Sequence, residues 1–352
     1  MNEKTDAAVT LSVLIPVYNA EAYLDALLQA LEEQRQDGVE VVALNDGSSD
    51  GSLRICEAYA QRHPDYIRVL SRENRGAIRT RRELFEAARG EWIWIIDADD
   101  RIEEHAIAAI LEMISSGDCD MILFDHHAVR DGAADYISQL PFEDGAVFSG
   151  AEKKELYQLV IRSARLNPLW NKVFRRCCVD FETDYTPFAD IIKGNDCFQT
   201  IPIVSNADRI LYRKHALYRY NRDNEGSLSH TFRLQTYTSM KKLWERKRAY
   251  LDLWEIRDSV LADYATRGWE VVIMLLSGIL NSNQAEIDYE TFFDLITKEV
   301  PFSEIIHDLP INKLAPLDRA AARAIRNHSK AASKALLATK AKARRVVSAI
   351  KA

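Results

Sequence analysis

Residues 91–101 read Glu-Trp-Ile-Trp-Ile-Ile-Asp-Ala-Asp-Asp-Arg, and this stretch decides the fold class. The apolar run at 92–96 predicts a buried strand, which is followed at once by Asp97, Asp99 and Asp100. Open α/β sheets bind ligands beyond the carboxyl ends of their strands, and crowded carboxylates repel one another unless a cation joins them. Oxygen ligands suit Mg²⁺ or Mn²⁺, so the run predicts diphosphate chemistry. A solvated acidic turn that caps the next helix is the alternative.

Short apolar stretches alternate with helical patterns before this run. The pattern predicts strands within 11–19, within 39–46 and at 67–70, and helices at 23–31, 52–60 and 78–88. This alternation with short connections predicts a largely parallel sheet covered by helices. The carboxyl ends of parallel strands share one edge, so residues 18–19, 46–48 and 97–99 are expected to converge on one cleft.

Four segments of this region resemble the signature of the family 2 glycosyltransferases, which have the GT-A fold. They are Ile-Pro-Val-Tyr-Asn-Ala-Glu at 15–21, Asn-Asp-Gly-Ser-Ser-Asp at 45–50, Asn-Arg-Gly at 74–76 and Asp-Ala-Asp-Asp at 97–100. Segments 169–176, 194–198 and 218–229 are similar to motifs of bacterial capsule and lipopolysaccharide members. The resemblance implies an α/β, Rossmann-like, mostly parallel sheet flanked by helices. It also implies an inverting enzyme that moves a sugar from a nucleotide-diphosphate sugar, with a UDP-sugar expected, to a glycan or lipid-linked acceptor.

The resemblance further implies roles for single residues. Asp196 would be the catalytic base. The residues that would bind the nucleotide-sugar are Pro16, Val17, Tyr18, Asn19, Glu21, Asp46, Gly47, Ser48, Asn74, Gly76, Arg81, Asp97 and Ala98. Asp99, helped by Asp97, would bind a divalent metal, Mn²⁺ or Mg²⁺. Asp100, Trp170, Asn171 and Lys172 would lie near the acceptor.

The residue pattern alone leaves alternatives for several of these positions. Asp196 also fits a carboxylate at the start of a helix, where the helix dipole favours it. Trp170 fits core packing as well as a platform for a sugar ring. His215 or His230 could supply a further metal ligand, although a lone histidine is more often structural.

Three departures from the family pattern are visible: Arg82 replaces an asparagine, Leu84 a glycine and Asn195 a glutamate. Residues 72–82 are also unusually basic. These features favour an acidic donor or acceptor, and they keep open a non-catalytic sugar- or membrane-binding protein on a decayed transferase fold.

Composition and missing motifs exclude other classes. Hydrophobic residues make up 47% and charged residues 28% of the 352 residues, as in a soluble globular protein with one large domain and an extension. Residues 1–8 lack a signal-peptide core, and the apolar stretch 271–280 is too short to span a bilayer. The five cysteines show no metal-ligand spacing and fit reduced thiols in the cytoplasm. No glycine-rich loop follows a strand, which argues against a dinucleotide oxidoreductase and a sugar nucleotidyltransferase.

The sequence divides into a catalytic domain at 1–230, a helical extension at 231–317 and a basic amphipathic helix at 318–352. Helices are expected at 106–114, 153–161, 234–253, 258–280 and 289–296, a strand at 121–124, a hairpin or loop at 130–148, and a connector broken by prolines after 300.

The last segment has ten basic and no acidic residues after Asp318. Because the formal net charge of the whole chain is −7, residues 1–318 carry a net charge of −17. The apolar face of the last segment predicts a helix on an anionic membrane at the inner face of the plasma membrane. That face comprises Ile325, Ala332, Leu336, Ala343, Val347 and Ile350. A helix packed on the acidic body, or a frayed tail, is the alternative. Nucleic-acid binding is not expected, because no aromatic residue follows Phe302 to stack on bases.

Overall fold

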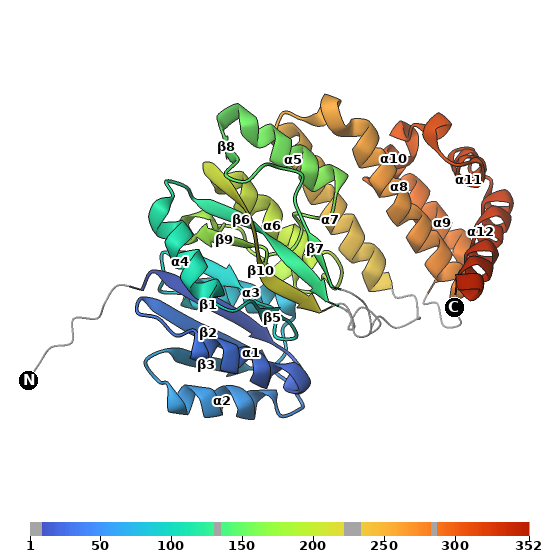
Figure 1. The fold of residues 1–352 in the computed structure, drawn as a ribbon. Helices are drawn as coiled ribbons and strands as arrows, with labels where there is room; N and C mark the ends of the chain where they lie inside the picture. Colours follow the sequence, from blue (N-terminus) through green and yellow to red (C-terminus); the bar gives the residue numbers. More distant parts are fainter. Residues whose placement is uncertain (1–8, 130–134, 222–233, 283–286, 352) are drawn as a thin grey trace, which may run out of the picture. The chain divides into compact units, whose positions relative to one another are not determined.

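The structure is a computed structural model that describes residues 9–129, 135–221, 234–282 and 287–351, with side chains up to residue 340 (Figure 1). Two compact units are present. The first contains residues 1–156, 165–190 and 195–227, and the second contains residues 157–164, 191–194 and 228–352.

Strands and helices alternate over residues 11–95 as the sequence predicts, and further strands and helices follow up to residue 221. In chain order the elements are β1 (Leu11–Val17), α1 (Glu21–Glu33), β2 (Val39–Asp46), α2 (Ser52–Arg62), β3 (Ile67–Arg72), α3 (Ala77–Ala87), β4 (Trp92–Ile95), β5 (Arg101–Ile102), α4 (Ala106–Ser116), β6 (Met121–Val129), β7 (Tyr136–Ser138), β8 (Val147–Ser149), α5 (Lys153–Arg162), β9 (Lys172–Arg175), α6 (Asn195–Asn206) and β10 (Arg209–Asn221). The segment expected to be a hairpin or loop contributes the short strands β7 and β8, and its residues 130–134 lie outside the described part.

The described residues form a ten-stranded sheet. Eight strands follow the order β3-β2-β1-β4-β9-β6-β10-β5, and β7 and β8 pair outside this order with β6 and β10. Strands β3, β2, β1 and β4 run parallel, whereas β9 runs antiparallel between β4 and β6. The sheet is therefore mixed, and its amino-terminal half is parallel as predicted. Because β1, β2 and β4 share one direction, their carboxyl ends lie at one edge of the sheet.

Helices cover both faces of the parallel strands (Figure 1). On one face, the leucines of α1 at 24, 27, 28 and 31 form one core with Leu11, Val13 and Ile15 of β1, together with apolar residues of α2 and α4. On the other face α3 packs against β1 and β2. Burial on both sides explains why β1, β2 and β4 read as continuous apolar runs.

The second unit is helical. Its helices are α7 (Leu234–Leu253), α8 (Arg257–Asn281), α9 (Tyr289–Lys298), α10 (Phe302–Asp308), α11 (Pro316–Arg326) and α12 (Lys330–Lys351). The connector expected after residue 300 contains a helix, which corrects the prediction. Pro301 lies at the N-cap of α10 and Pro316 in the first turn of α11. Proline is tolerated there because the first amides of a helix need no intrahelical partner. Both prolines therefore start helices.

The basic segment forms two helices, so the prediction of one helix over 318–352 is wrong. The break falls at residues 327–329, where His328 has a positive φ of 52°. The break changes which side chains face inward. Ile325 and Leu337 are buried, whereas Ala332 is exposed. The apolar face of residues 316–340 is therefore packed within the helical unit, which agrees with the packed-helix alternative. None of the described helices is long and apolar enough to span a membrane.

Candidate active site at the carboxyl edge of the sheet

The loops that follow β1 and β2 are tied together. The Asn19 amide donates to Ser48 Oγ over 3.0 Å, and the Ser49 amide donates to Asn19 Oδ1 over 2.8 Å. The Gly51 amide donates to Glu21 Oε2 over 2.8 Å. Asn19 and Glu21 therefore shape the loops, and the predicted convergence of these two strand ends is confirmed. The Tyr18 side chain beside them is 56% exposed and faces solvent at this edge.

Asp46, at the end of β2, organises the turn at 72–76. Its carboxylate accepts the amide hydrogens of Arg75, over 2.7 Å, and Gly76, over 3.1 Å, as well as a hydrogen bond from the Arg72 guanidinium. A carboxylate can accept about four hydrogen bonds, so about one position is left for a ligand.

Gly47 beside Asp46 has φ of +70°, and a Cβ there would lie 2.6 Å from the Asn74 amide nitrogen. Glycine is needed at such a position because any side chain would collide with the neighbouring backbone. The structure thus brings the predicted residues Asp46, Gly47, Asn74 and Gly76 together. Pro16 and Val17 are the last two residues of β1, and Val17 lies in the core.

Arg81 connects two carboxylates that are far apart in the sequence. Its guanidinium lies 2.6 Å from Asp196 Oδ1 and 3.7 Å from Asp97 Oδ1. It also donates to Asn195 Oδ1 over 3.0 Å and to Gln199 Oε1 over 3.4 Å. Arg81 is 6% exposed, whereas the Asp97 and Asp196 side chains are 25% and 31% exposed. The cation therefore lies beneath two carboxylates that remain open to a ligand.

Asp196 lies in the first turn of α6, so it fits both readings of its position: a carboxylate at a helix N-terminus and a member of the site. Asn195, which replaces the family's glutamate, accepts from Arg81 through its amide oxygen. Gln199, one turn further along α6, was not foreseen as part of this cluster, because nothing in the local pattern marks it.

Asp97 and Asp99, which follow β4, and Asp196 of α6 outnumber the Arg81 guanidinium. Burial raises the pKa of Asp97 to about 7; Arg81 opposes this rise, and the charges of Asp196 and Asp99 add to it. Arg81 pairs with Asp97 and Asp196, and Asp99 adds a further acidic group near Asp97. The acidic groups therefore outnumber the guanidinium, which suits a divalent cation.

The described residues contain no group of three or more His, Cys, Asp or Glu side chains that could hold a metal by themselves. Mg²⁺, however, is commonly bound by one or two carboxylates together with substrate phosphates. Asp97 and Asp99 fit such a shared site. His215 is exposed, and His230 lies outside the described residues.

Asp100 is buried, so it does not fit the predicted role of an acceptor residue. It is 1% exposed, accepts from the Tyr218 hydroxyl over 2.6 Å and accepts from the Asn221 amide over 2.7 Å. Its carboxylate therefore joins the turn after β4 to β10. Ala98, in the same turn, is buried.

Trp170 is 4% exposed, because its ring stacks on Tyr218 with centroids 4.5 Å apart and on Tyr220 with centroids 5.2 Å apart. His126 meets its edge at 4.6 Å. These contacts fit the core-packing alternative, since the ring has no open face for a sugar.

Asn171 and Lys172 are also buried, and their polar atoms bond to the chain itself. Asn171 Nδ2 donates to the Arg165 carbonyl over 2.9 Å, and Lys172 Nζ donates to the Leu166 and Pro168 carbonyls. Burial lowers the pKa of Lys172 to about 7. In the structure these two side chains hold the turn that precedes β9, and the charge of Asp196 opposes the fall in the pKa of Lys172.

The unusual residues of α3 and the turn before it have structural partners. Arg82 donates to the carbonyls of Asp180 and Phe181 and pairs with Glu86, so it ties α3 to the loop at 180–185. Leu84 is fully buried. Arg72 pairs with Asp46 and Glu83, and Arg75 with Glu83. The basic stretch is therefore largely neutralised within the protein, which removes it as an argument for an acidic substrate.

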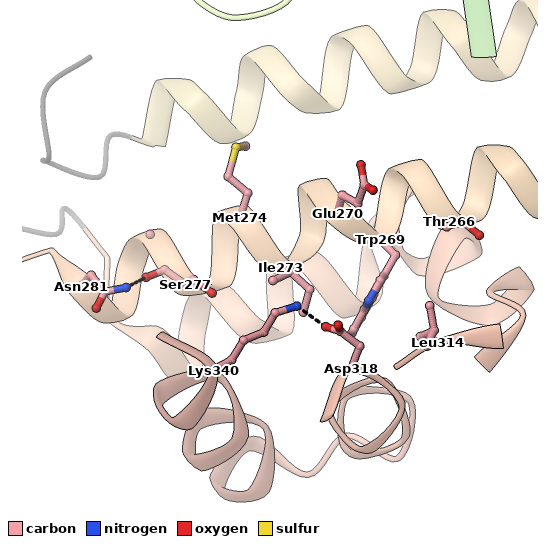
Figure 2. Close-up of a pocket in the computed structure, with 11 residues that line it drawn as sticks. Thr266, Trp269, Glu270, Ile273, Met274, Ser277, Asn281, Leu314, Asp318 and Lys340 are labelled. Carbon is pink, nitrogen blue, oxygen red and sulfur yellow. Dashed lines mark hydrogen bonds and ion pairs between the residues drawn. The ribbon is translucent and has the colours of Figure 1, made fainter. Parts of the chain in front are cut away.

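A separate cavity of about 430 Å³ lies in the helical unit (Figure 2). Its lining includes Trp269, Ile273 and Met274 of α8 and the ion pair between Asp318 and Lys340. None of the predicted site residues lines it.

Comparisons with known proteins agree with this architecture. Residues 12–177 match the family described as Glycosyl transferase family 2. The putative glycosyltransferase EpsH of Bacillus subtilis is 29% identical over 243 residues, which cover 68% of each chain. The poly(ribitol-phosphate) beta-N-acetylglucosaminyltransferase TarS of Staphylococcus aureus is 26% identical over 265 residues, which cover 73% of this chain but only 44% of TarS.

The crystal structure of S. aureus TarS 1–349 has a TM-score of 0.65 at 19% identity and covers 95% of this chain and 92% of that chain. The same TarS fragment has been solved in complex with UDP and with UDP-GlcNAc. The structural likeness supports the fold, and the family match covers the carboxyl edge up to β9. Residues 12–177 therefore form a domain of the Glycosyl transferase family 2, and the chain shares its fold with TarS 1–349.

Proposed function

We propose that this enzyme transfers a sugar, with inversion, from a UDP-sugar to a hydroxyl of a glycan or a lipid-linked acceptor. The observation that carries the proposal is the buried Arg81, which holds Asp97 and Asp196 at one edge of the sheet. The UDP and UDP-GlcNAc complexes of TarS support the choice of donor.

The donor would bind across the loops after β1 and β2. Tyr18 presents an exposed aromatic ring that can stack on the nucleobase. The remaining acceptor position of Asp46 can receive a nucleobase N–H. Asp97 would contact the ribose or the metal. Tyr18 is exposed and the Asp97 side chain is 25% exposed, whereas Asp46 is buried at the same edge.

Asp99 and Asp97 would hold the divalent metal, which would neutralise charge on the leaving diphosphate. The acceptor hydroxyl must lose a proton as its oxygen attacks the anomeric carbon. Asp196 would accept that proton from the face of the sugar opposite the diphosphate. Arg81 fixes the position of Asp196 from below, and a fixed geometry matters because a misplaced base loses much of its effect.

Replacing Asp196 with asparagine tests this assignment, because the amide keeps the shape of the side chain but cannot accept the proton. Transfer, measured at a temperature where the variant is folded, should fall by about 10²–10⁴-fold, the usual contribution of a general base. UDP binding should stay near that of the wild type, whereas the melting temperature should fall because the buried Arg81 loses a charged partner. The matched control is Asp208→Asn, which alters an exposed carboxylate just beyond α6. Full transfer by Asp196→Asn would rule out this base.

Exposed basic residues of α11 and α12, including Arg323 and Lys334, support a second proposal about location. We propose that this surface attracts the anionic leaflet of the plasma membrane from its cytoplasmic side. The attraction would be electrostatic, at about 1 kcal/mol for each basic residue near the surface, because the apolar face of these helices is packed inside the unit.

A further inference from the structure

The turn that carries Asp97 and Asp99 is fastened to β10 through one tyrosine. The Asp97 amide donates to the Tyr218 hydroxyl over 3.1 Å, and the same hydroxyl donates to Asp100 Oδ2 over 2.6 Å. The Asn221 amide donates to Asp100 Oδ1 over 2.7 Å. The Asp100 amide closes the turn by donating to the Asp97 carbonyl over 3.1 Å.

Tyr218 itself is held rigidly. It is fully buried, its ring lies parallel to Trp170 at an interplanar angle of 4°, and it meets Trp94 at 64°. Trp94 in turn donates through Nε1 to the Trp170 carbonyl over 2.9 Å. The hydroxyl therefore has one fixed position between an amide donor and a carboxylate acceptor. A phenolic hydroxyl can donate and accept at the same time, which a phenylalanine at this position could not do.

We propose that Tyr218 is a positioning residue for the transfer reaction: it sets the place of Asp97 and Asp99, and through them the affinity for the metal–diphosphate group. This rests on the proposed function, in which these two carboxylates hold the metal. Groups that orient metal ligands from behind typically change metal affinity or activity by about 10–100-fold when they are removed. Tyr218 touches neither metal nor substrate in this account.

The chain offers a matched control on the same strand. Tyr212 is also fully buried in β10, and its hydroxyl donates to Asp125 Oδ1 over 2.8 Å. Tyr212→Phe therefore removes the same kind of buried tyrosine–aspartate hydrogen bond, but in a place that does not touch the turn after β4. A purely structural role would make the two variants behave alike.

The experiment compares wild type, Tyr218→Phe and Tyr212→Phe in three measurements on the full chain. Hydrogen exchange of the peptide that spans residues 92–104 reports the turn without any ligand. Calorimetric titration with UDP, in the presence and absence of Mn²⁺, reports the site. Thermal melting reports stability.

We expect Tyr218→Phe alone to speed exchange in this peptide and to weaken Mn²⁺-dependent UDP binding by about 10–100-fold, with similar melting temperatures for both variants. Unchanged exchange and binding in Tyr218→Phe, or equal losses in Tyr212→Phe, would overturn the proposal. If the wild type shows no Mn²⁺-dependent UDP binding, the proposed function fails, and the exchange measurement still decides whether Tyr218 holds the turn.

Discussion

Arg81 is the residue whose removal should cost the site most. Arg81→Met keeps an unbranched side chain of similar length in the buried position but removes the charge. The substitution then removes the donor that is shared by Asp97, Asn195, Asp196 and Gln199. We expect Arg81→Met to lower both the stability of the protein and its transfer activity.

The size of the stability loss follows from burial. Breaking a fully buried ion pair costs about 3–5 kcal/mol, but solvent screens carboxylates that are 25% and 31% exposed. We therefore expect a loss of about 2–3 kcal/mol. At about 2–4 °C for each kcal/mol, as for units of roughly 150–250 residues, the melting temperature should fall by about 4–12 °C.

Activity should fall further than stability. Displacement of the Asp196 carboxylate by about 1 Å can cost roughly 10²-fold in rate, so transfer should drop by at least that factor at a temperature where the variant is folded. Arg81→Lys should lie between the two, because lysine restores the charge but lacks the planar fork that reaches several acceptors.

The assay combines thermal melting with transfer measured at saturating donor. Arg82→Met is the matched control, because Arg82 lies next to Arg81 on α3 but binds the carbonyls of Asp180 and Phe181. It should lose stability and keep its transfer rate within a few-fold. A melting temperature and transfer rate of Arg81→Met equal to those of the wild type would contradict this role of Arg81. An equally large loss of transfer rate in Arg82→Met would contradict it as well.

Three further predictions concern other parts of the chain. Burial raises the pKa of Asp100 from 3.8 to about 8, so the stability due to its bound proton is present below about pH 4 and is lost as the pH rises to about 8. The melting temperature of Asp100→Asn should therefore fall less between pH 6 and pH 9 than that of the wild type. An equal fall in the variant and the wild type would contradict this pKa. Trp170→Ala should destabilise the protein by about 3–5 kcal/mol as a core truncation; a change in acceptor KM without a loss of stability, measured by denaturant unfolding and transfer kinetics, would instead mark a sugar platform. Arg323→Glu with Lys334→Glu should reduce flotation with anionic vesicles and leave donor hydrolysis unchanged, and full flotation would exclude this surface as the membrane contact.

The sequence was most informative where short-range pattern decides structure. The apolar run before Asp97, and the polar turns after β1 and β2, were enough to predict parallel strands that end at one edge of the sheet. Burial on both faces of the sheet enforces such runs, and for this reason the prediction held.

Contacts between residues that are far apart in the sequence could not be predicted from local patterns. Arg81 donates a hydrogen bond to Asn195, which lies 114 positions further along the sequence. Trp170 is part of the core only because Tyr218 and Tyr220 of β10 stack on its ring. The break in the basic tail falls at residues 327–329, which contain neither proline nor glycine. In each case the deciding contact comes from tertiary packing. Tyr218 illustrates this most clearly, since its motif was noted in the sequence but its bond to the Asp97 amide was not.

We propose that the edge formed by β1, β2 and β4 binds and activates a nucleotide-sugar with a divalent metal. This proposal is tested most directly by measuring hydrolysis of a panel of nucleotide-sugars with Mn²⁺ or Mg²⁺, in the wild type and in Asp99→Ala. We expect metal-dependent turnover of one UDP-sugar that is abolished in Asp99→Ala while the variant stays folded. Turnover that is independent of metal, or equal in the variant, would contradict it.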